Sequence, residues 1–144
     1  MFKPMISTKL KKKGTVLFYD GLKAHGVYGK KMLKSKEAYD YDFVIHEISK
    51  IENIGDYLVS NNVAIAVLFI YGKDRLYELL PFLNREINLI LCTDPVEVKW
   101  LQHNFPEIVM LDIDLPKTEL FYQIETHILR FRKDREKEGK VWHR

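Results

Sequence analysis

Eight apolar residues run without a polar break from Val63 to Ile70, and no other feature constrains the fold of this chain as strongly. A short, continuous apolar run is typical of a strand that is buried on both faces of a parallel sheet. In a parallel α/β domain, the carboxyl end of such a central strand is where chemistry usually takes place. Here the strand delivers Phe69, Ile70 and Tyr71 to that place, and none of them is an acid.

Strand-like and helix-like segments alternate along the rest of the chain. The predicted strands are 15–20, 41–49, 63–70, 87–93 and 107–113. The predicted helices are 28–38, 51–62, 73–85, 94–105 and 114–138. Strands that alternate with helices imply a parallel sheet with right-handed crossovers and helices on both faces. The sequence therefore predicts a three-layer αβα sandwich.

Two of the later helices carry specific expectations. In the helix after residue 72, four leucines at helical spacing predict one apolar face, namely Leu76, Leu79, Leu80 and Leu83. Pro81 is expected to shorten or kink this helix. In the last helix the expected apolar stripe consists of Leu120, Ile124, Ile128 and Phe131.

The strongest local helix signal lies in the segment 94–105. Asp94 is a suitable N-cap, Pro95 suits the first helical position, and Glu97 suits the third. This order resembles a capping box, in which the side chains at the two ends satisfy backbone N–H groups of the first turn. We therefore expect a helix that begins directly after Asp94.

Charge is unevenly spread along the chain. Residues 1–13 carry five lysines and no acid, and residues 130–144 carry seven Lys or Arg against three acids, although the net charge of the whole chain is only +3. The body between these ends is acidic, which argues against a broad face for nucleic acid. We expect solvated basic ends and no nucleic-acid partner, and basic arms that contact nucleic acid are the third alternative for the function of the chain. The expected boundaries are a basic N-terminal arm at 1–13, a (βα)5 domain at 14–132 and a charged extension at 133–144.

Composition and cysteine content indicate a cytoplasmic protein. No apolar run approaches the ~20 residues that a transmembrane helix needs, and the first residues lack the apolar segment of a secretory signal. Cys92 is the single cysteine, which excludes an internal disulfide and fits a reducing compartment. We expect its thiol to be buried and inert, and we expect no membrane partner.

Three local patterns resemble the receiver domain of two-component response regulators, over roughly residues 14–132. "VLFYD" resembles the first receiver strand, whose acidic end helps to hold Mg²⁺, and Asp20 is the acid that is present. "LILCT" resembles the fourth strand, which ends in Ser or Thr, here Thr93. "DIDLPKTEL" resembles the fifth strand and last helix, but Leu115 stands where the family has Lys, and Lys117 comes two residues later. The resemblance implies a flavodoxin-like sheet of order 2-1-3-4-5.

The acid that accepts the phosphoryl group in this family is missing. The resemblance places Phe69 or Ile70 at that position, and no acid occurs between Asp56 and Asp74. Phosphoryl transfer in a receiver needs a carboxylate nucleophile, a metal held by further carboxylates and a cation. The chain is therefore expected to be a pseudo-receiver without catalytic residues, whose vestigial pocket consists of Asp20, Ile70, Thr93 and Asp114.

The alternative is a small-molecule or cation-binding domain, or an enzyme, that uses the crevice at the strand ends. Asp20, Thr93 and Asp114 would be its polar groups, and Asp112 stands two residues before Asp114, on the same side of an extended segment. A glycine pair in the segment 25–31 also leaves open an anion at a helix start. We expect no metal and no cofactor, because the histidines lack ligand spacing and the loop after residue 20 lacks the Ser/Thr-rich phosphate loop of flavin proteins.

The expected function is therefore regulatory binding to a protein partner or to a second copy of the chain. The family often pairs through its last two helices and the strand between them. The candidate residues on this surface are Trp100, His103, Phe121 and Tyr122, because aromatic residues are enriched at interface cores. The opposing interpretation is that Trp100 and Phe121 complete the intramolecular core.

Overall fold

A computed structural model of the chain describes residues 14–22, 44–50, 52–96 and 98–142. Its five strands are all parallel and lie in the order β2-β1-β3-β4-β5. Their bounds are Thr15–Asp20 (β1), Val44–Ile48 (β2), Val63–Phe69 (β3), Asn88–Thr93 (β4) and Val109–Asp112 (β5). The predicted fold class and strand order are confirmed.

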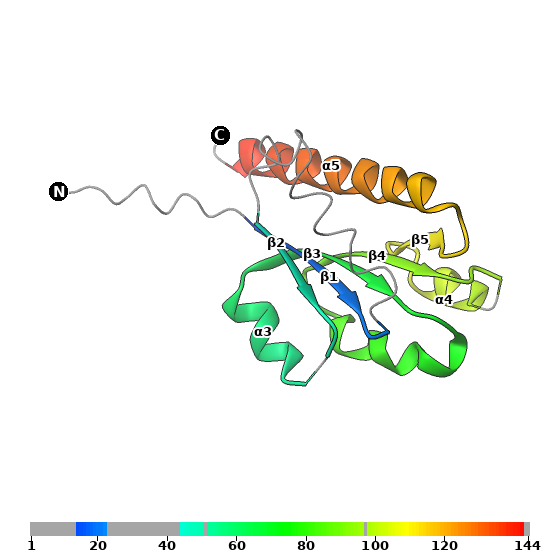
Figure 1. Ribbon diagram of the computed structural model, residues 1–144. Helices are drawn as coiled ribbons and strands as arrows, with labels where there is room; N and C mark the ends of the chain where they lie inside the picture. The colour runs from blue at the N-terminus through cyan, green and yellow to red at the C-terminus, as the bar shows by residue number, and fades with distance from the viewer. Residues whose placement is uncertain (1–13, 23–43, 51, 97, 143–144) are drawn as a thin grey trace.

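Helices cover both faces of this sheet, as Figure 1 shows. The long helix α5 (Lys117–Trp142) lies across one face. The helix α3 (Ile54–Ser60), the 3₁₀ helix η2 (Lys73–Phe82) and the helix α4 (Lys99–Asn104) lie on the other. The helix predicted at 28–38 falls outside the described residues. No helix in the described ranges is long and apolar enough to cross a membrane.

The central strand β3 contributes to two hydrophobic cores, because successive side chains of a strand point to opposite faces. All its residues are buried. Ile65, Val67 and Phe69 belong to the core beneath α5, where the predicted stripe residues Leu120, Ile124 and Ile128 are also buried. Phe131, predicted for the same stripe, is only partly buried against this core. Burial of each such large side chain stabilises the fold by about 1.5–3 kcal/mol.

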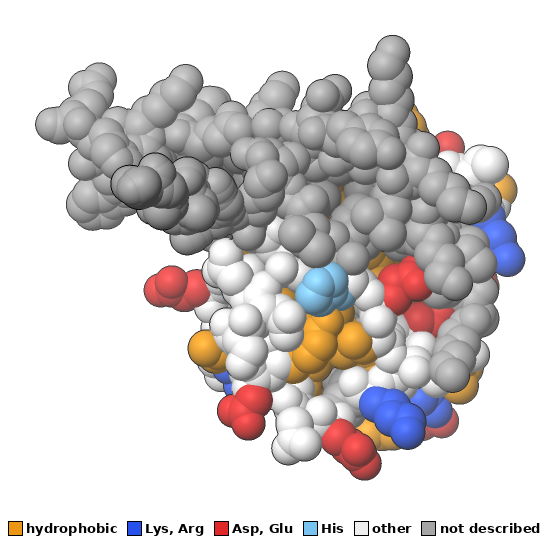
Figure 2. Space-filling model, turned by 60° about the vertical axis from the view of Figure 1, so that its left-hand side comes forward, with side chains coloured by type: hydrophobic (Ala, Val, Ile, Leu, Met, Phe, Trp, Pro, Cys, Tyr) orange, Lys and Arg blue, Asp and Glu red, His pale blue; other side chains and the backbone are white. Residues whose placement is uncertain are grey.

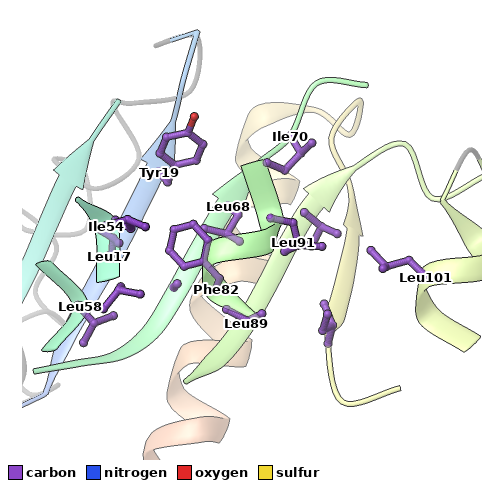
Figure 3. Packing of buried hydrophobic residues seen from close by; sticks show 14 of the residues in the cluster. Leu17, Tyr19, Ile54, Leu58, Leu68, Ile70, Phe82, Leu89, Leu91 and Leu101 are labelled. Atoms are coloured by element: carbon purple, nitrogen blue, oxygen red, sulfur yellow. The ribbon is translucent and has the colours of Figure 1, made fainter. Parts of the chain in front are cut away.

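The second core lies between the sheet and the layer of α3, η2 and α4, and Figure 3 shows its packing. Ala66, Leu68 and Ile70 enter it from the chain of β3. Phe82, from the end of η2, lies beside Leu68 and is fully buried. The eight-residue apolar run is therefore explained by the presence of a helical layer on each face of its strand.

The segment after β3 differs from the prediction, because it forms a 3₁₀ helix over all ten residues of Lys73–Phe82. With three residues per turn, side chains three apart lie on one face. Leu76, Leu79 and Phe82 share the face toward the sheet, and the last two are buried. Leu80, predicted for the apolar face, is instead 65% exposed. The prediction that all four leucines share one face was therefore wrong, because it assumed the 3.6-residue period of an α-helix.

The start of α4 also differs from the prediction. Asp94 Oδ1 does accept a 3.0 Å hydrogen bond from the N–H of Val96, as an N-cap would. The backbone nevertheless forms a turn at Pro95 and Val96, and the helix begins only at Lys99, with Val98 as its N-cap residue. Glu97 falls outside the described residues. The aspartate therefore stabilises a turn that precedes the helix, a role that Asp shares with N-capping.

Figure 2 shows the side of the molecule on which α3 lies. Hydrophobic side chains gather in the middle of this face beside a histidine, and acidic and basic side chains are spread around them. In this part of the fold, His46 Nδ1 of β2 and the Tyr57 hydroxyl of α3 form a 2.6 Å hydrogen bond. Burial raises the pKa of Tyr57. The bond links the edge strand β2 to the helical layer.

Candidate functional site

The carboxyl edge of the sheet is closed by hydrophobic side chains where a receiver carries its phosphoacceptor. Phe69 lies in register with Asp20 of β1 and with Cys92 of β4. Phe69 and Ile70 are both fully buried, and the Phe69 ring stacks against Phe18 at a centroid distance of 6.5 Å. The N–H of Ile70 donates a 3.0 Å hydrogen bond to the carbonyl of Cys92, which extends the β3–β4 pairing by one residue.

Asp20 is the one receiver-type acid at this edge, and its carboxylate is engaged by the protein itself. The residue is only 3% exposed. Oδ1 accepts a 2.6 Å hydrogen bond from the Tyr71 hydroxyl and a 3.1 Å hydrogen bond from the N–H of Leu22. A buried carboxylate requires such donors. Tyr71 directly follows the apolar run, but a sequence gives no sign that its hydroxyl reaches an acid 51 residues away.

The four predicted pocket residues do not face a common crevice. Asp20 follows Tyr19, which belongs to the second core, and pairs with Phe69, so alternation directs Asp20 toward the α5 side. Ile70 belongs to the opposite core. Thr93 directly follows Cys92, which belongs to the α5-side core, so Thr93 points to the opposite face, as Ile70 does. Asp20 is therefore separated by the sheet from Ile70 and Thr93.

Thr93 is fully buried, and its Oγ1 has no hydrogen-bond partner among the described residues. Asp112 lies in register with Thr93 at the end of β5, but its side chain is exposed. Asp112 Oδ1 accepts a 2.9 Å hydrogen bond from the N–H of Asp114, which is also exposed. These two acids shape the turn between β5 and α5. Within the described ranges, no three Asp, Glu, His or Cys side chains lie together as a metal site.

A second polar cluster, which the sequence did not reveal, lies beneath Gly21 on the opposite side of β1. Glu78 Oε2 accepts a 2.7 Å hydrogen bond from the Tyr19 hydroxyl and forms a 2.7 Å ion pair with Arg75 Nη2. Glu78 is 3% exposed, whereas the Arg75 side chain remains 32% exposed. A Cβ atom at Gly21 would lie 2.8 Å from the Tyr19 hydroxyl oxygen, so a larger residue at this position would have to displace the cluster.

Burial and the neighbouring Glu78 carboxylate raise the pKa of Tyr19, so its phenol stays protonated and donates to that carboxylate. The hydrogen bond to Glu78 likewise raises the pKa of Arg75. Glu78 stands between Tyr77 and Leu79 in the sequence. The α-helix expected for this segment gave no reason to predict that the Glu78 side chain is buried. In a 3₁₀ helix, side chains three residues apart share a face, so a period of three would have indicated that Arg75 and Glu78 meet.

The four predicted interface residues lie on helices at opposite sides of the edge strand β5. Trp100 and His103 are exposed on α4, whose Leu101 belongs to the second core. Tyr122 is 64% exposed on α5, whereas Phe121 is partly buried against the α5-side core. Trp100 thus lies at the surface, and Phe121 contributes to the core.

No protein-family model and no curated protein matches this sequence. Among solved structures, the chain is similar to the response regulator LqsR of Legionella pneumophila, with a TM-score of 0.58 and 13% sequence identity. The similarity covers 85% of this chain and 46% of that one, so the chain spans less than half the length of the solved protein. At this identity the similarity establishes a receiver-like fold.

Proposed function

We propose that this chain is a non-catalytic, receiver-like signalling or regulatory domain that acts by binding proteins and lacks a phosphoacceptor. The observation that supports this most directly is the full burial of Phe69 and Ile70 at the end of β3. Its receiver-like fold, shared with a response regulator, supports the signalling role.

The chemistry of phosphoryl transfer supports the same conclusion. A receiver needs a carboxylate that is open to attack on a phosphoryl donor, together with a metal and a cation that stabilise the developing charge. Asp20 is buried and hydrogen-bonded to Tyr71 and Leu22. Leu115 stands where the family has Lys, and it packs partly buried against the α5-side core. A hydrophobic side chain at that place contributes no charge to a transition state.

The proposed protein-binding surface is the edge formed by α4, β5 and α5. Trp100, His103 and Tyr122 are exposed there, and aromatic side chains are the type that interface cores favour. Light scattering at increasing concentration tests whether a second copy binds this edge. We expect any self-association to weaken in Tyr122→Ala and to persist in Val59→Ala, which changes an exposed residue of α3. A strict monomer would remove the second copy and leave a different protein as the partner.

The absence of phosphoryl transfer is tested by incubation with acetyl phosphate and Mg²⁺, followed by intact-mass measurement before and after hydroxylamine. We expect no adduct, with a conventional receiver domain treated in parallel as the positive control. A hydroxylamine-labile phosphoryl adduct on Asp20, Asp112 or Asp114 would overturn the proposal. It would favour a catalytic or ligand-binding role for the carboxyl edge instead.

A further inference from the structure

A hydrophobic groove of about 460 Å³ lies between η2 and α4. We call it the η2–α4 groove, and it is lined by Lys73, Leu76, Tyr77, Leu79, Leu80, Leu83, Trp100, Leu101 and Phe105. Its floor is formed by buried residues of the second core, Leu79 and Leu101. Its volume falls within the range of about 300–1,000 Å³ that is usual for ligand sites. The groove lies on the helical layer opposite α5.

The groove owes its hydrophobic walls to the 3₁₀ period of η2. Because side chains three apart share a face, Tyr77 and Leu80 lie together on a face that points away from the sheet. They are 58% and 65% exposed, and Trp100 on α4 is 55% exposed. Large apolar side chains grouped around a hollow mark an interaction site, whereas single ones scattered over a surface do not.

The charges around the groove indicate what kind of surface it binds. Lys73 is the only charged residue among those that line it. Lys99, next to Trp100, is also exposed. Asp74, next to Lys73, is an exposed acid on the same face of η2 as Tyr77. A two-fold contact between two copies would bring the two lysines of both copies to one interface, and like charges oppose such a contact. Since these two lysines outnumber Asp74, charge complementarity favours a different protein with acidic residues.

We propose that the η2–α4 groove binds an amphipathic helix of a partner protein, with an apolar stripe in the groove and acidic residues beside Lys73 and Lys99. This inference rests on the proposed function, because it names the surface and the chemistry of one protein partner. Insertion of the apolar face of a helix into a hydrophobic groove is a recurring mode of peptide recognition. Tyr77 and Trp100 supply the aromatic side chains that dominate binding energy at such surfaces.

The test uses a displayed library of amphipathic helical peptides whose flanking positions vary between acidic and basic residues. Peptides are selected on the full chain, and their affinities are measured by fluorescence polarisation. We expect enrichment of acidic-flanked peptides. Leu80→Asp and Trp100→Ala should each weaken their binding by about tenfold or more. Val59→Asp, at an exposed residue of α3 outside the groove, should leave it unchanged.

A charge exchange provides the decisive control. Lys73→Glu should weaken the selected acidic peptide several-fold and should restore binding when the acidic flank of that peptide is replaced by lysine. Absence of enrichment, enrichment of basic peptides, or binding that Leu80→Asp leaves intact would each overturn the proposal. So would a wild-type dimer that Leu80→Asp dissociates, because a second copy would then fill the groove. None of these results affects the test with acetyl phosphate, so the two proposals fail separately.

Discussion

The Tyr71 hydroxyl donates a 2.6 Å hydrogen bond to the Asp20 carboxylate and thereby joins the chain after β3 to the end of β1. In a receiver the acid at this place would help to hold a cation, whereas here it accepts a hydrogen bond from a tyrosine. Asp20 also accepts from the N–H of Leu22, so the carboxylate fixes the first turn after β1. The acid that most resembles a functional residue therefore has a structural role.

Tyr71→Phe should lower the free energy of unfolding by about 1–3 kcal/mol, because it removes a hydrogen bond from a buried carboxylate. Urea denaturation measures the change. Tyr122→Phe is the matched control, since that residue is 64% exposed, and it should change stability by less than about 0.5 kcal/mol. Equal effects of the two substitutions would show that the Tyr71–Asp20 bond does not form in solution.

Ile70→Asp should cost about 4 kcal/mol or more, because the new carboxylate would be buried without a partner. Ile70 has no exposed surface, whereas Leu80, on the same helical-layer side, is 65% exposed. Leu80→Asp is therefore the control and should melt close to the wild type. If Ile70→Asp also melted at the wild-type temperature, the position would face water and could serve as an acceptor site.

Stability should fall as the pH rises above about 10, the usual pKa of tyrosine. Burial, together with the hydrogen bond to Glu78, raises the pKa of Tyr19 in the folded chain. Above pH ~10 the unfolded chain loses this phenol proton first, so the folded state binds more protons and the unfolding free energy declines. Below pH ~10 the contribution of Tyr19 is fully present.

Urea denaturation between mildly and strongly alkaline pH measures this decline. Tyr19→Phe should reduce the slope of this decline, because it removes the buried phenol whose pKa is raised. A slope unchanged by Tyr19→Phe would mean that Tyr19 ionises as easily in the folded chain as in the unfolded one.

Cys92 should resist thiol reagents while the chain is folded. Its side chain is fully buried, and burial raises the pKa of its thiol, which suppresses the reactive thiolate. A disulfide reagent should therefore modify it only at the rate at which the chain unfolds, and at once in denaturant. Rapid modification under native conditions would contradict the packing of β4.

The sequence predicted the sheet because its strongest pattern, the run from Val63 to Ile70, depends on burial alone and not on contacts between distant residues. The stripe of α5 was predictable for the same reason. The η2 segment was not, because its four leucines fit one face at a period of 3.6, whereas the 3₁₀ helix divides them between two faces. Only the burial of Phe82 and Glu78 reveals the shorter period.

The candidate site was less predictable than the fold. The absence of an acid at the end of β3 can be read directly from the sequence. The bond between Tyr71 and Asp20, and the cluster of Tyr19 with Glu78, depend on where two separate segments meet. The side of the sheet toward which Asp20 points also depends on its register with Phe69, which no local pattern specifies.

The most direct test of the central claim is an amide NMR titration with beryllofluoride and Mg²⁺, which together mimic the phosphoryl group on a receiver. The account predicts that the amide resonances of Phe69, Ile70 and Thr93 do not shift, because hydrophobic side chains fill the acceptor position. Saturable shifts at the ends of β3 and β4 that require both Mg²⁺ and beryllofluoride would contradict it, since they would show that an acceptor site assembles at this edge.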